Sequence, residues 1–235
     1  MKLHVIGCYG PYPNAGGAAS GYLLEHEGRA LLMDCGAGIL GKLMNLWDPA
    51  ALECVLLSHL HFDHASDMLV LRYYLERMGK TLPVYVPGED ASPLRSLLTE
   101  PAFRVLPYPD ELSVMGLTIT NMPVNHPVPC RALRVTDGEH TLVFTGDTTV
   151  CPGLSEFARG ADVLLADSAF LASEWTEKMP HMSAKMCGEL ACQAQAKRLY
   201  LTHLAPRHAP ETVTKEAREA FPASEAVRPG MVIAL

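Results

Sequence analysis

The feature that most restricts how this chain can fold is a six-residue polar block placed directly after an apolar, β-type run. Residues 54–57 read Cys-Val-Leu-Leu, and Ser58 leads into the block His59-Leu60-His61-Phe62-Asp63-His64. A helical pattern begins at Ala65. This order puts three imidazoles and one carboxylate at the carboxyl end of a strand, an arrangement that few core packings would need.

The residue types in this block are those of a metal site. Imidazole nitrogen and carboxylate oxygen suit Zn²⁺ and related ions, whereas Ca²⁺ and Mg²⁺ prefer all-oxygen sites. The alternative is a polar loop with solvated histidines. Three further residues, His126, Asp147 and His203, each lie just past a β-type run. Because loops that follow strands often gather functional groups, we expect these residues to converge on one edge of a layered sheet structure.

Composition and charge indicate what kind of protein this is. The 235 residues include 19 Lys+Arg and 26 Asp+Glu, a formal charge of −7, and no Lys/Arg cluster, so we expect no strong nucleic-acid binding patch. A hydrophobic share of 49% predicts a globular core. Apolar runs are strand-sized and the N-terminus lacks a signal-peptide core, which predicts a cytoplasmic protein outside the membrane. The seven scattered cysteines have no C-x-x-C pair and are expected to be reduced.

Short β-type runs bounded by Gly, Pro, Asp or Asn recur along the chain. They predict strands at 3–6, 22–25, 30–33, 54–57, 84–86, 117–121, 133–135, 141–144, 163–166, 199–201 and 231–233. Asp137-Gly138 predicts a type I′ turn and a β-hairpin over about 132–145. The Pro-rich stretch 101–109 is too short and too apolar for a linker. We therefore expect one domain, 1–235.

Helical patterns separate these runs. One covers 65–78, with Leu69, Tyr73 and Glu76 on one face, and another covers 183–197, with Ser183 as its N-cap. A third is expected over 211–220, because Pro210 is well tolerated in a first turn.

The joint pattern H-x-H-x-D-H, then His126, Asp147 and His203 in this order, resembles the metallo-β-lactamase superfamily over nearly the whole chain. Asp34, in Asp34-Cys35-Gly36, matches the superfamily's D-x-G motif, where it would support the ligand loop. The resemblance implies an α/β layered fold, an αββα sandwich with two facing mixed β-sheets and helices outside.

The same resemblance implies two divalent metal ions, with Zn²⁺ favoured and Mn²⁺ or Fe as alternatives. His59, His61 and His126 would hold the first ion, Asp63, His64 and His203 the second, and Asp147 would bridge them. Two such ions lower the pKa of a shared water toward neutrality, so the implied chemistry is hydrolysis by a metal-bridging hydroxide. The ions also bring positive charge that attracts a small anionic substrate.

Three motifs favour one branch of the superfamily. Gly146-Asp147-Thr148, Asp167 in Ala166-Asp167-Ser168-Ala169-Phe170, and His181 in His181-Met182-Ser183-Ala184 are similar to motifs of ribonuclease Z-like phosphodiesterases. By this resemblance the catalytic side chains are Asp63, His181 and Asp167. Asp167 would hold His181, which would stabilise a phosphate oxygen or protonate the leaving oxygen.

Two departures narrow the substrate. Ribonuclease Z carries a tRNA-binding arm between the positions of His126 and Asp147, where this chain has only 20 residues that read as a hairpin. Asp167 is also one methylene shorter than the glutamate of the family motif. We therefore expect a phosphodiesterase for a small nucleotide-type or cyclic phosphodiester. The alternatives are a carboxylic ester, thioester or lactone hydrolase with the same metals and a non-catalytic metal-binding protein, and the resemblance also allows a homodimer.

Overall fold

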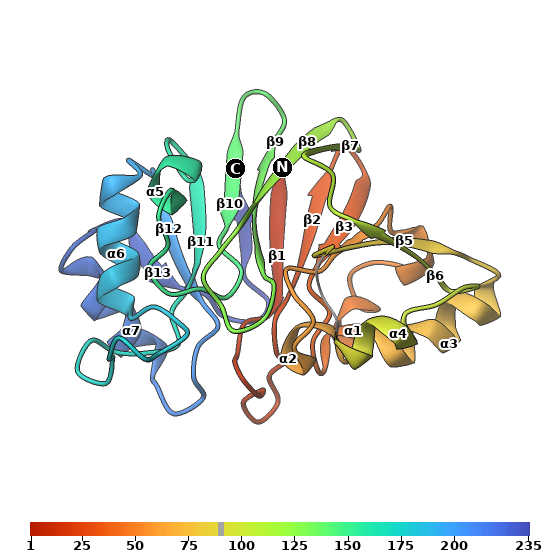
Figure 1. The fold of residues 1–235 in the computed structure, drawn as a ribbon, viewed down its shortest axis with the longest axis horizontal. Helices are drawn as coiled ribbons and strands as arrows, with labels where there is room; N and C mark the ends of the chain where they lie inside the picture. The colour runs from red at the N-terminus through yellow and green to blue at the C-terminus, as the bar shows by residue number, and fades with distance from the viewer. Residues whose placement is uncertain (89–91) are drawn as a thin grey trace. The chain divides into compact units, whose positions relative to one another are not determined.

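The computed structural model describes residues 1–88 and 92–235, which form two compact units. The first unit comprises residues 1–109 with 229–234, and the second comprises residues 110–228 with Leu235. Each unit contains one seven-stranded mixed β-sheet and its own helices (Figure 1). The predicted fold class, two mixed sheets with helices outside, is confirmed.

The first unit holds the sheet ordered β14-β1-β2-β3-β4-β5-β6. Its strands are β1 (Lys2–Gly7), β2 (Gly21–His26), β3 (Arg29–Met33), β4 (Val55–Leu56), β5 (Leu82–Val86), β6 (Phe103–Pro107) and β14 (Val232–Ala234). Its helices are α1 (Ile39–Leu43), the 3₁₀ turn η1 (Pro49–Ala51), α2 (Phe62–Ala65), α3 (Met68–Met78) and α4 (Pro93–Leu97).

Strand direction gathers the first unit's functional loops at one edge of its sheet. Strands β3 to β6 are mutually parallel, and β2 is antiparallel to both β1 and β3, so β1 runs in the same direction as β3. The loop after β1, Asp34 after β3 and His59 after β4 therefore leave the sheet from the same edge.

The core face of α3 differs from the predicted one. Met68, Leu71 and Leu75 are buried, while Leu69 and Tyr73 are exposed. The face defined by Leu69, Tyr73 and Glu76 is thus the outer face. The pattern was ambiguous because eight of the eleven residues of α3 are apolar or aromatic, and they occupy both faces of the helix.

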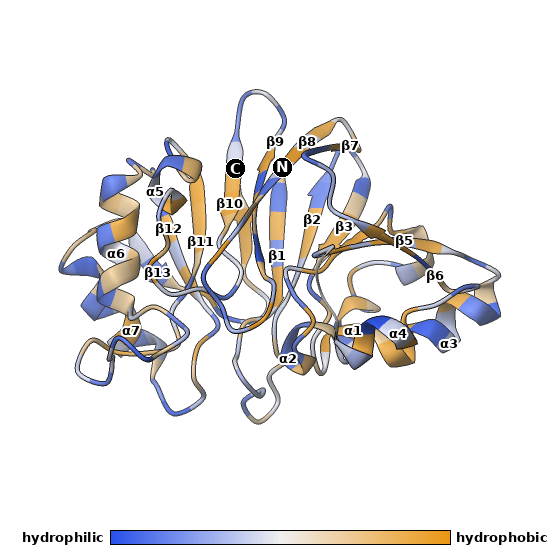
Figure 2. Ribbon diagram, in the orientation of Figure 1, coloured by the Kyte–Doolittle hydropathy of each residue, from blue (hydrophilic) through white to orange (hydrophobic). Residues whose placement is uncertain are grey.

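The second unit holds the sheet ordered β13-β12-β11-β10-β9-β8-β7. Its strands are β7 (Glu111–Val114), β8 (Leu117–Pro123), β9 (Arg131–Thr136), β10 (Thr141–Phe144), β11 (Val163–Asp167), β12 (Leu199–Thr202) and β13 (Ser224–Ala226). Its helices are α5 (Leu154–Phe157), α6 (Ala184–Gln193) and α7 (Pro210–Arg218), and α6 and α7 lie beside β12 and β13 in Figure 1. All residues of β11 are buried, as expected for a central parallel strand, and Figure 2 shows its apolar colouring.

The helix starts predicted in this unit are confirmed. Ser183 caps α6, because its hydroxyl oxygen accepts the amide hydrogen of Met186 at 3.3 Å. Pro210 is the first residue of α7. Helices α6 and α7 approach closely at Gly188, where a Cβ atom would lie 2.6 Å from the carbonyl oxygen of Ala217.

The predicted hairpin exists, but its turn is not type I′. Strands β9 and β10 pair with Thr136 opposite Thr141, so residues 137–140 form a four-residue loop. Gly138 has a positive φ of 94°, whereas Asp137 does not have the positive φ that a type I′ turn needs. The Asp137 carboxylate instead accepts the amide hydrogens of Glu139 and His140 at 3.0 and 2.7 Å, which favours the longer loop.

The cysteines are mostly buried thiols. All seven cysteines are free, and five of them are buried. Burial raises the pKa of the Cys8 and Cys54 thiols to about 12, so both stay protonated at neutral pH. In the described part of the chain, every helix falls short of the length and apolarity that a membrane span requires.

Candidate functional site

In the first unit, the four ligand-type side chains of the His59–His64 block lie together at the edge where β4 ends. The Nε2 atom of His59 lies 3.0 Å from Nδ1 of His61, and the ring centroids of His59 and His64 are 4.1 Å apart. Asp63 Oδ2 lies 3.6 Å from Nε2 of His64. His59 and His64 are buried, which holds their rings in place.

Asp34 supports this cluster through hydrogen bonds and a contact with His64. Its carboxylate is fully buried and accepts hydrogen bonds from the Ser20 hydroxyl at 2.9 Å and from the Ser58 amide and hydroxyl at 2.8 and 3.1 Å. Asp34 Oδ2 also lies 2.7 Å from Nδ1 of His64. This contact fixes the ring so that Nε2 is the nitrogen directed toward Asp63. A carboxylate behind a histidine is the usual support for a metal-binding imidazole.

The backbone at Asp34 has a left-handed conformation, with φ of 57°. Such a conformation is uncommon outside glycine and costs about 1 kcal/mol or more, so it persists only where surrounding contacts impose it. Here it lets the chain turn sharply after β3 while the carboxylate points back under the histidine block. The sequence prediction that Asp34 supports the ligand loop matches the contacts it makes.

In the second unit, four acidic and histidine side chains meet at the edge where three parallel strands end. Strands β10, β11 and β12 are parallel neighbours, and Asp147, Asp167 and His203 follow or end them in that order. One ligand-type atom from each of Asp147, Asp167, His181 and His203 lies within 4.8 Å of all the others. His203 Nε2 lies 3.2 Å from Asp147 Oδ2. His203 also has a left-handed backbone, with φ of 54°.

His181 is the central member of this second-unit cluster. Its Nδ1 atom lies 2.7 Å from Asp167 Oδ2 and 3.8 Å from Asp147 Oδ2. Its ring stacks on that of His203, with centroids 4.7 Å apart and planes inclined by 18°. The side chain is 15% exposed, so the ring is accessible from one side only. The contact with Asp167 fixes the orientation of the ring, so Nε2 is the nitrogen that faces away from this carboxylate.

His126 reaches the same cluster from the end of β8. Strand β8 is antiparallel to β9, and β9 is antiparallel to β10, so β8 ends at the same edge as β10. The His126 ring meets the His181 ring edge-on, with centroids 5.3 Å apart. Its Nδ1 atom lies 3.4 Å from the carbonyl oxygen of Pro180. The second unit therefore brings together all of its predicted site residues.

Several residues that position the site were not identified from the sequence. The Trp175 indole donates to the carbonyl oxygen of His181 at 2.9 Å, so Trp175 positions His181. The Thr148 amide donates to Asp167 Oδ2 at 3.0 Å. The Asp167 amide donates to the Thr145 hydroxyl oxygen at 3.0 Å. No spacing rule points to these contacts: the Trp175 bond spans six residues within one loop, and the Thr148 and Thr145 bonds span 19 and 22 residues.

One buried thiol completes the surroundings of Asp167. Cys187 donates to the Asp167 carbonyl oxygen at 3.0 Å. Burial raises the pKa of the Cys187 thiol well above its usual range, and the Asp167 carboxylate raises it further. Cys187 is thus a neutral donor rather than a nucleophile.

The donor chemistry of both clusters suits a transition metal. Each cluster combines imidazole nitrogens with carboxylate oxygens, and each contains a buried carboxylate, Asp34 or Asp167, that holds a ring nitrogen at 2.7 Å. Divalent metal ions are the cofactors that such donors suggest.

A family model described as "Beta-lactamase superfamily domain" matches residues 29–204. That range is about three quarters of the chain and includes every residue of both clusters. The chain belongs to the metallo-β-lactamase superfamily. It is a metallo-hydrolase by family and fold, as its relatives also indicate.

Among curated proteins, "Probable metallo-hydrolase YhfI" of Bacillus subtilis is 36% identical over 229 residues, which cover 94% of each chain. The crystal structure of YhfI aligns with a TM-score of 0.94 at 34% identity, over 99% of this chain and 98% of YhfI. "Ribonuclease Z" of Methanopyrus kandleri is 26% identical over 274 residues, covering 99% of this chain and 97% of the relative. The human short-form tRNase Z shares the fold, with a TM-score of 0.82 at 19% identity, over 100% of this chain and 99% of that one. The chain lies in the ribonuclease Z-like branch.

Proposed function

We propose that this chain is a dinuclear metal-dependent phosphodiesterase that hydrolyses a small nucleotide-type or cyclic phosphodiester. The observation that carries the proposal is the 2.7 Å contact between Asp167 and His181, beside Asp147 and His203. A histidine held by a buried carboxylate is a group that can donate a proton to a leaving oxygen or a hydrogen bond to a phosphate oxygen. The ribonuclease named among the relatives supports the same reaction class.

The proposal assigns two metal ions to seven residues. His59, His61 and His126 would hold the first ion, Asp63, His64 and His203 the second, and Asp147 would bridge them. Support comes from the donor types in each cluster and from the carboxylate contacts that direct His64 and His181. When bound, the ions supply Lewis-acid activation of water and of the phosphoryl oxygen. Zn²⁺ is our first choice, with Mn²⁺ or Fe as alternatives.

The side chains of the chain itself have defined tasks in this proposal. Asp34 holds His64 in one orientation, and Asp167 does the same for His181. With Nδ1 bound to Asp167, protonated His181 presents an N–H at Nε2, and the adjacent carboxylate stabilises that charged form. His181 would then protonate the leaving alkoxide.

The size of the substrate follows from the chain between His126 and Asp147. Those residues include β9 and β10 with a four-residue loop, and an extra arm for gripping a large RNA has no place among them. The chain also has a formal charge of −7. A polyanion such as precursor tRNA needs phosphate-neutralising Lys or Arg groups, which an acidic surface does not provide. Free thiols at all seven cysteines suit a cytoplasmic setting.

The test is a substrate panel assayed with metal-loaded protein, alongside metal analysis. We expect close to two ions per chain, since seven ligands exceed one tetrahedral site. An activated phosphodiester, bis(p-nitrophenyl) phosphate, should be cleaved faster than β-lactam, thioester and lactone probes, and precursor tRNA should be a poor substrate. The Asp147→Ala variant is the matched control and should lose both metal and activity. Lactone or thioester turnover without phosphodiester cleavage would assign the same site to the rival hydrolase class.

A further inference from the structure

We propose that Phe62, together with Tyr12 in a loop that leaves the same edge of the sheet, forms an aromatic platform for the nucleobase of the substrate. The inference rests on the proposed phosphodiesterase function and adds what binds the organic part of the molecule. Stacking on an exposed ring is a known way to hold any base, because every base has a π-face.

The position of Phe62 is unusual for a large apolar side chain. It is the first residue of α2, placed in the chain between His61 and Asp63, and its side chain is 73% exposed. Burying a phenylalanine contributes about 1.5 to 3 kcal/mol to folding, and this ring leaves most of that unused. Its neighbours His64 and Ala65 on the same short helix are buried. The helix thus turns its ligand side inward and presents its aromatic ring to solvent.

The backbone that carries Phe62 is tightly fixed. The Ser20 amide donates to the Asp63 carbonyl oxygen at 3.0 Å, and the Cys35 amide donates to that of His64 at 2.7 Å. Gly36 allows this close approach, because a Cβ atom there would lie 1.8 Å from the Asp63 carbonyl oxygen. A ring on a fixed backbone loses little conformational entropy when a ligand stacks on it.

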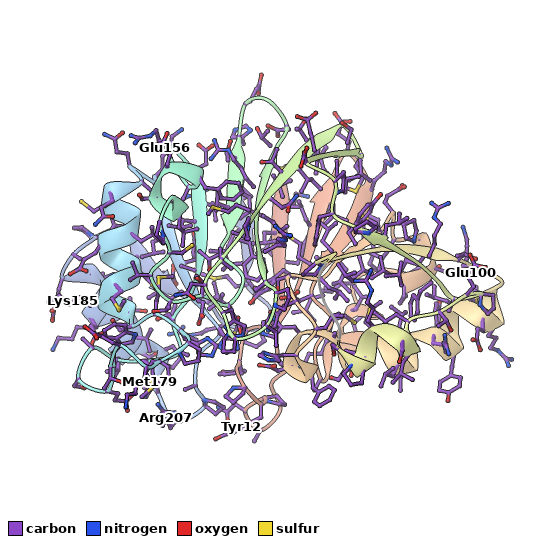
Figure 3. The ribbon with its side chains drawn as sticks, viewed as in Figure 1. Tyr12, Glu100, Glu156, Met179, Lys185 and Arg207 are labelled. Carbon is purple, nitrogen blue, oxygen red and sulfur yellow. The ribbon has the colours of Figure 1, made fainter. Side chains whose placement is uncertain are left out.

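A second exposed ring leaves the sheet from the same edge. Tyr12 lies in the loop after β1 and is 61% exposed, and Figure 3 shows it at the outer end of that loop. The loop is anchored, since Gly17 donates to the Asn14 carbonyl oxygen at 2.8 Å and Lys42 Nζ donates to that of Gly16 at 2.9 Å. This edge of the first sheet therefore carries two exposed aromatic side chains, one of which lies within the histidine block.

A nucleobase fits this placement better than a protein partner does. Phe62 lies between the proposed ligands His61 and Asp63 in the chain, and consecutive Cα atoms are about 3.8 Å apart, so the backbone that carries the ring is also the backbone that carries these ligands. A phosphodiester held by those ligands would carry its base one sugar away. The outer face of α3, with Leu69 and Tyr73, could serve a protein partner without Phe62.

Binding measurements on metal-loaded protein test the platform apart from catalysis. Isothermal titration calorimetry would compare adenosine monophosphate with ribose 5-phosphate, which lacks the base. We expect wild type to bind the nucleotide about 10-fold or more tighter, within the range measured for one stacked base. Phe62→Ala should remove most of that preference and Tyr12→Ala part of it, while Phe62→Trp should keep it. Metal content should be unchanged in all three.

Tyr73→Ala is the matched control, because Tyr73 is also an exposed aromatic residue, 70% exposed, but lies eleven residues further along. Its nucleotide preference should equal that of wild type. Equal binding of both ligands to wild type, or an unchanged preference in both Phe62→Ala and Tyr12→Ala, overturns the platform. A Phe62→Ala variant that keeps the nucleotide preference of wild type and differs only in its oligomeric mass also overturns the platform. If wild type prefers the nucleotide through Phe62 but cleaves no phosphodiester, the platform stands and the proposed function fails.

Discussion

His181 is the residue on which the assigned chemistry depends most directly. It contacts Asp167 at 2.7 Å and lies against His203 and His126, and our proposal assigns it as an acid rather than as a metal ligand. We predict that His181→Ala lowers kcat for a nucleotide phosphodiester by about 10²- to 10⁴-fold, the range for a lost general acid. The loss should be smaller for a p-nitrophenyl ester, whose leaving group needs no proton. Steady-state kinetics with both substrates measure the difference.

Metal analysis of the same variant tests whether His181 is an acid or a metal ligand. Removal of an acid leaves the metal content unchanged, whereas removal of a ligand lowers it. Asp167→Asn should give a smaller loss in the same direction, because Asp167 orients the imidazole and favours its charged form. If His181→Ala loses metal along with activity, or cleaves both substrates at wild-type rates, His181 is not the acid.

At this scale, the sequence predicted residues with strong chemical signatures and missed those that act through a single contact. The histidine block and Asp34 follow strand ends at motif spacing, so their association could be foreseen. Trp175 and Thr148 each contribute one hydrogen bond, to His181 and Asp167 respectively. Such a bond depends on loop paths that local patterning does not encode. The exposure of Phe62 likewise depends on how α2 packs.

At the scale of elements, the hairpin loop between β9 and β10 provides a pH-dependent test. Partial burial tends to raise the pKa of Asp137, but hydrogen bonds from the His140 and Glu139 amides outweigh it, so the pKa is lowered. A lowered folded pKa means that Asp137 stabilises the fold above its unfolded value of about 3.9 and loses this effect as pH falls through the folded pKa. We predict that Asp137→Ala lowers the unfolding free energy by about 1 kcal/mol at neutral pH.

Urea unfolding of metal-free protein at about pH 7 and about pH 3 measures this effect. The difference between Asp137→Ala and wild type should shrink at the lower pH. Glu139→Ala is the control, because Glu139 is exposed in the same loop and contributes only its amide to the Asp137 contact. A difference that stays constant or grows toward acid would show that the carboxylate does not hold the loop.

The elements that the sequence missed are edge strands or very short helices. Strands β6, β7 and β13 were not predicted, and all three are sheet edges. An edge strand has a neighbour on one side only and tolerates proline and polar residues, so its apolar signal is weak; β6 ends in Pro107. Helices α1, α4 and α5 have four or five residues, less than two turns, which is too short for a periodic pattern. The central strands and the longer helices were predicted because their burial repeats along the chain.

At the scale of the whole molecule, the path of the chain ties the two units together in sequence. The first unit uses residues 1–109 and then 229–234, so the second unit is an insertion within it. Strand β14 returns to pair with β1, placing Ile233 opposite Leu3. Only Tyr108, Pro109 and Asp110 separate β6 from β7. Composition predicted a large core, but it could not predict this partition, because no change in composition marks the boundary.

We propose from this path that residues 1–235 form one domain and unfold in one transition. The second unit is joined to the first at both of its ends. Unfolding of the first unit would release both ends of the second, so we expect the two units to unfold together. At about 0.7 kcal/mol per residue, a single transition of 235 residues would have an enthalpy of about 160 kcal/mol. Scanning calorimetry of the metal-free protein should give one peak with a van't Hoff enthalpy near that value. Two peaks, or one peak with a van't Hoff enthalpy of about 80 kcal/mol, would mean that the units unfold independently and that the single-domain proposal is wrong.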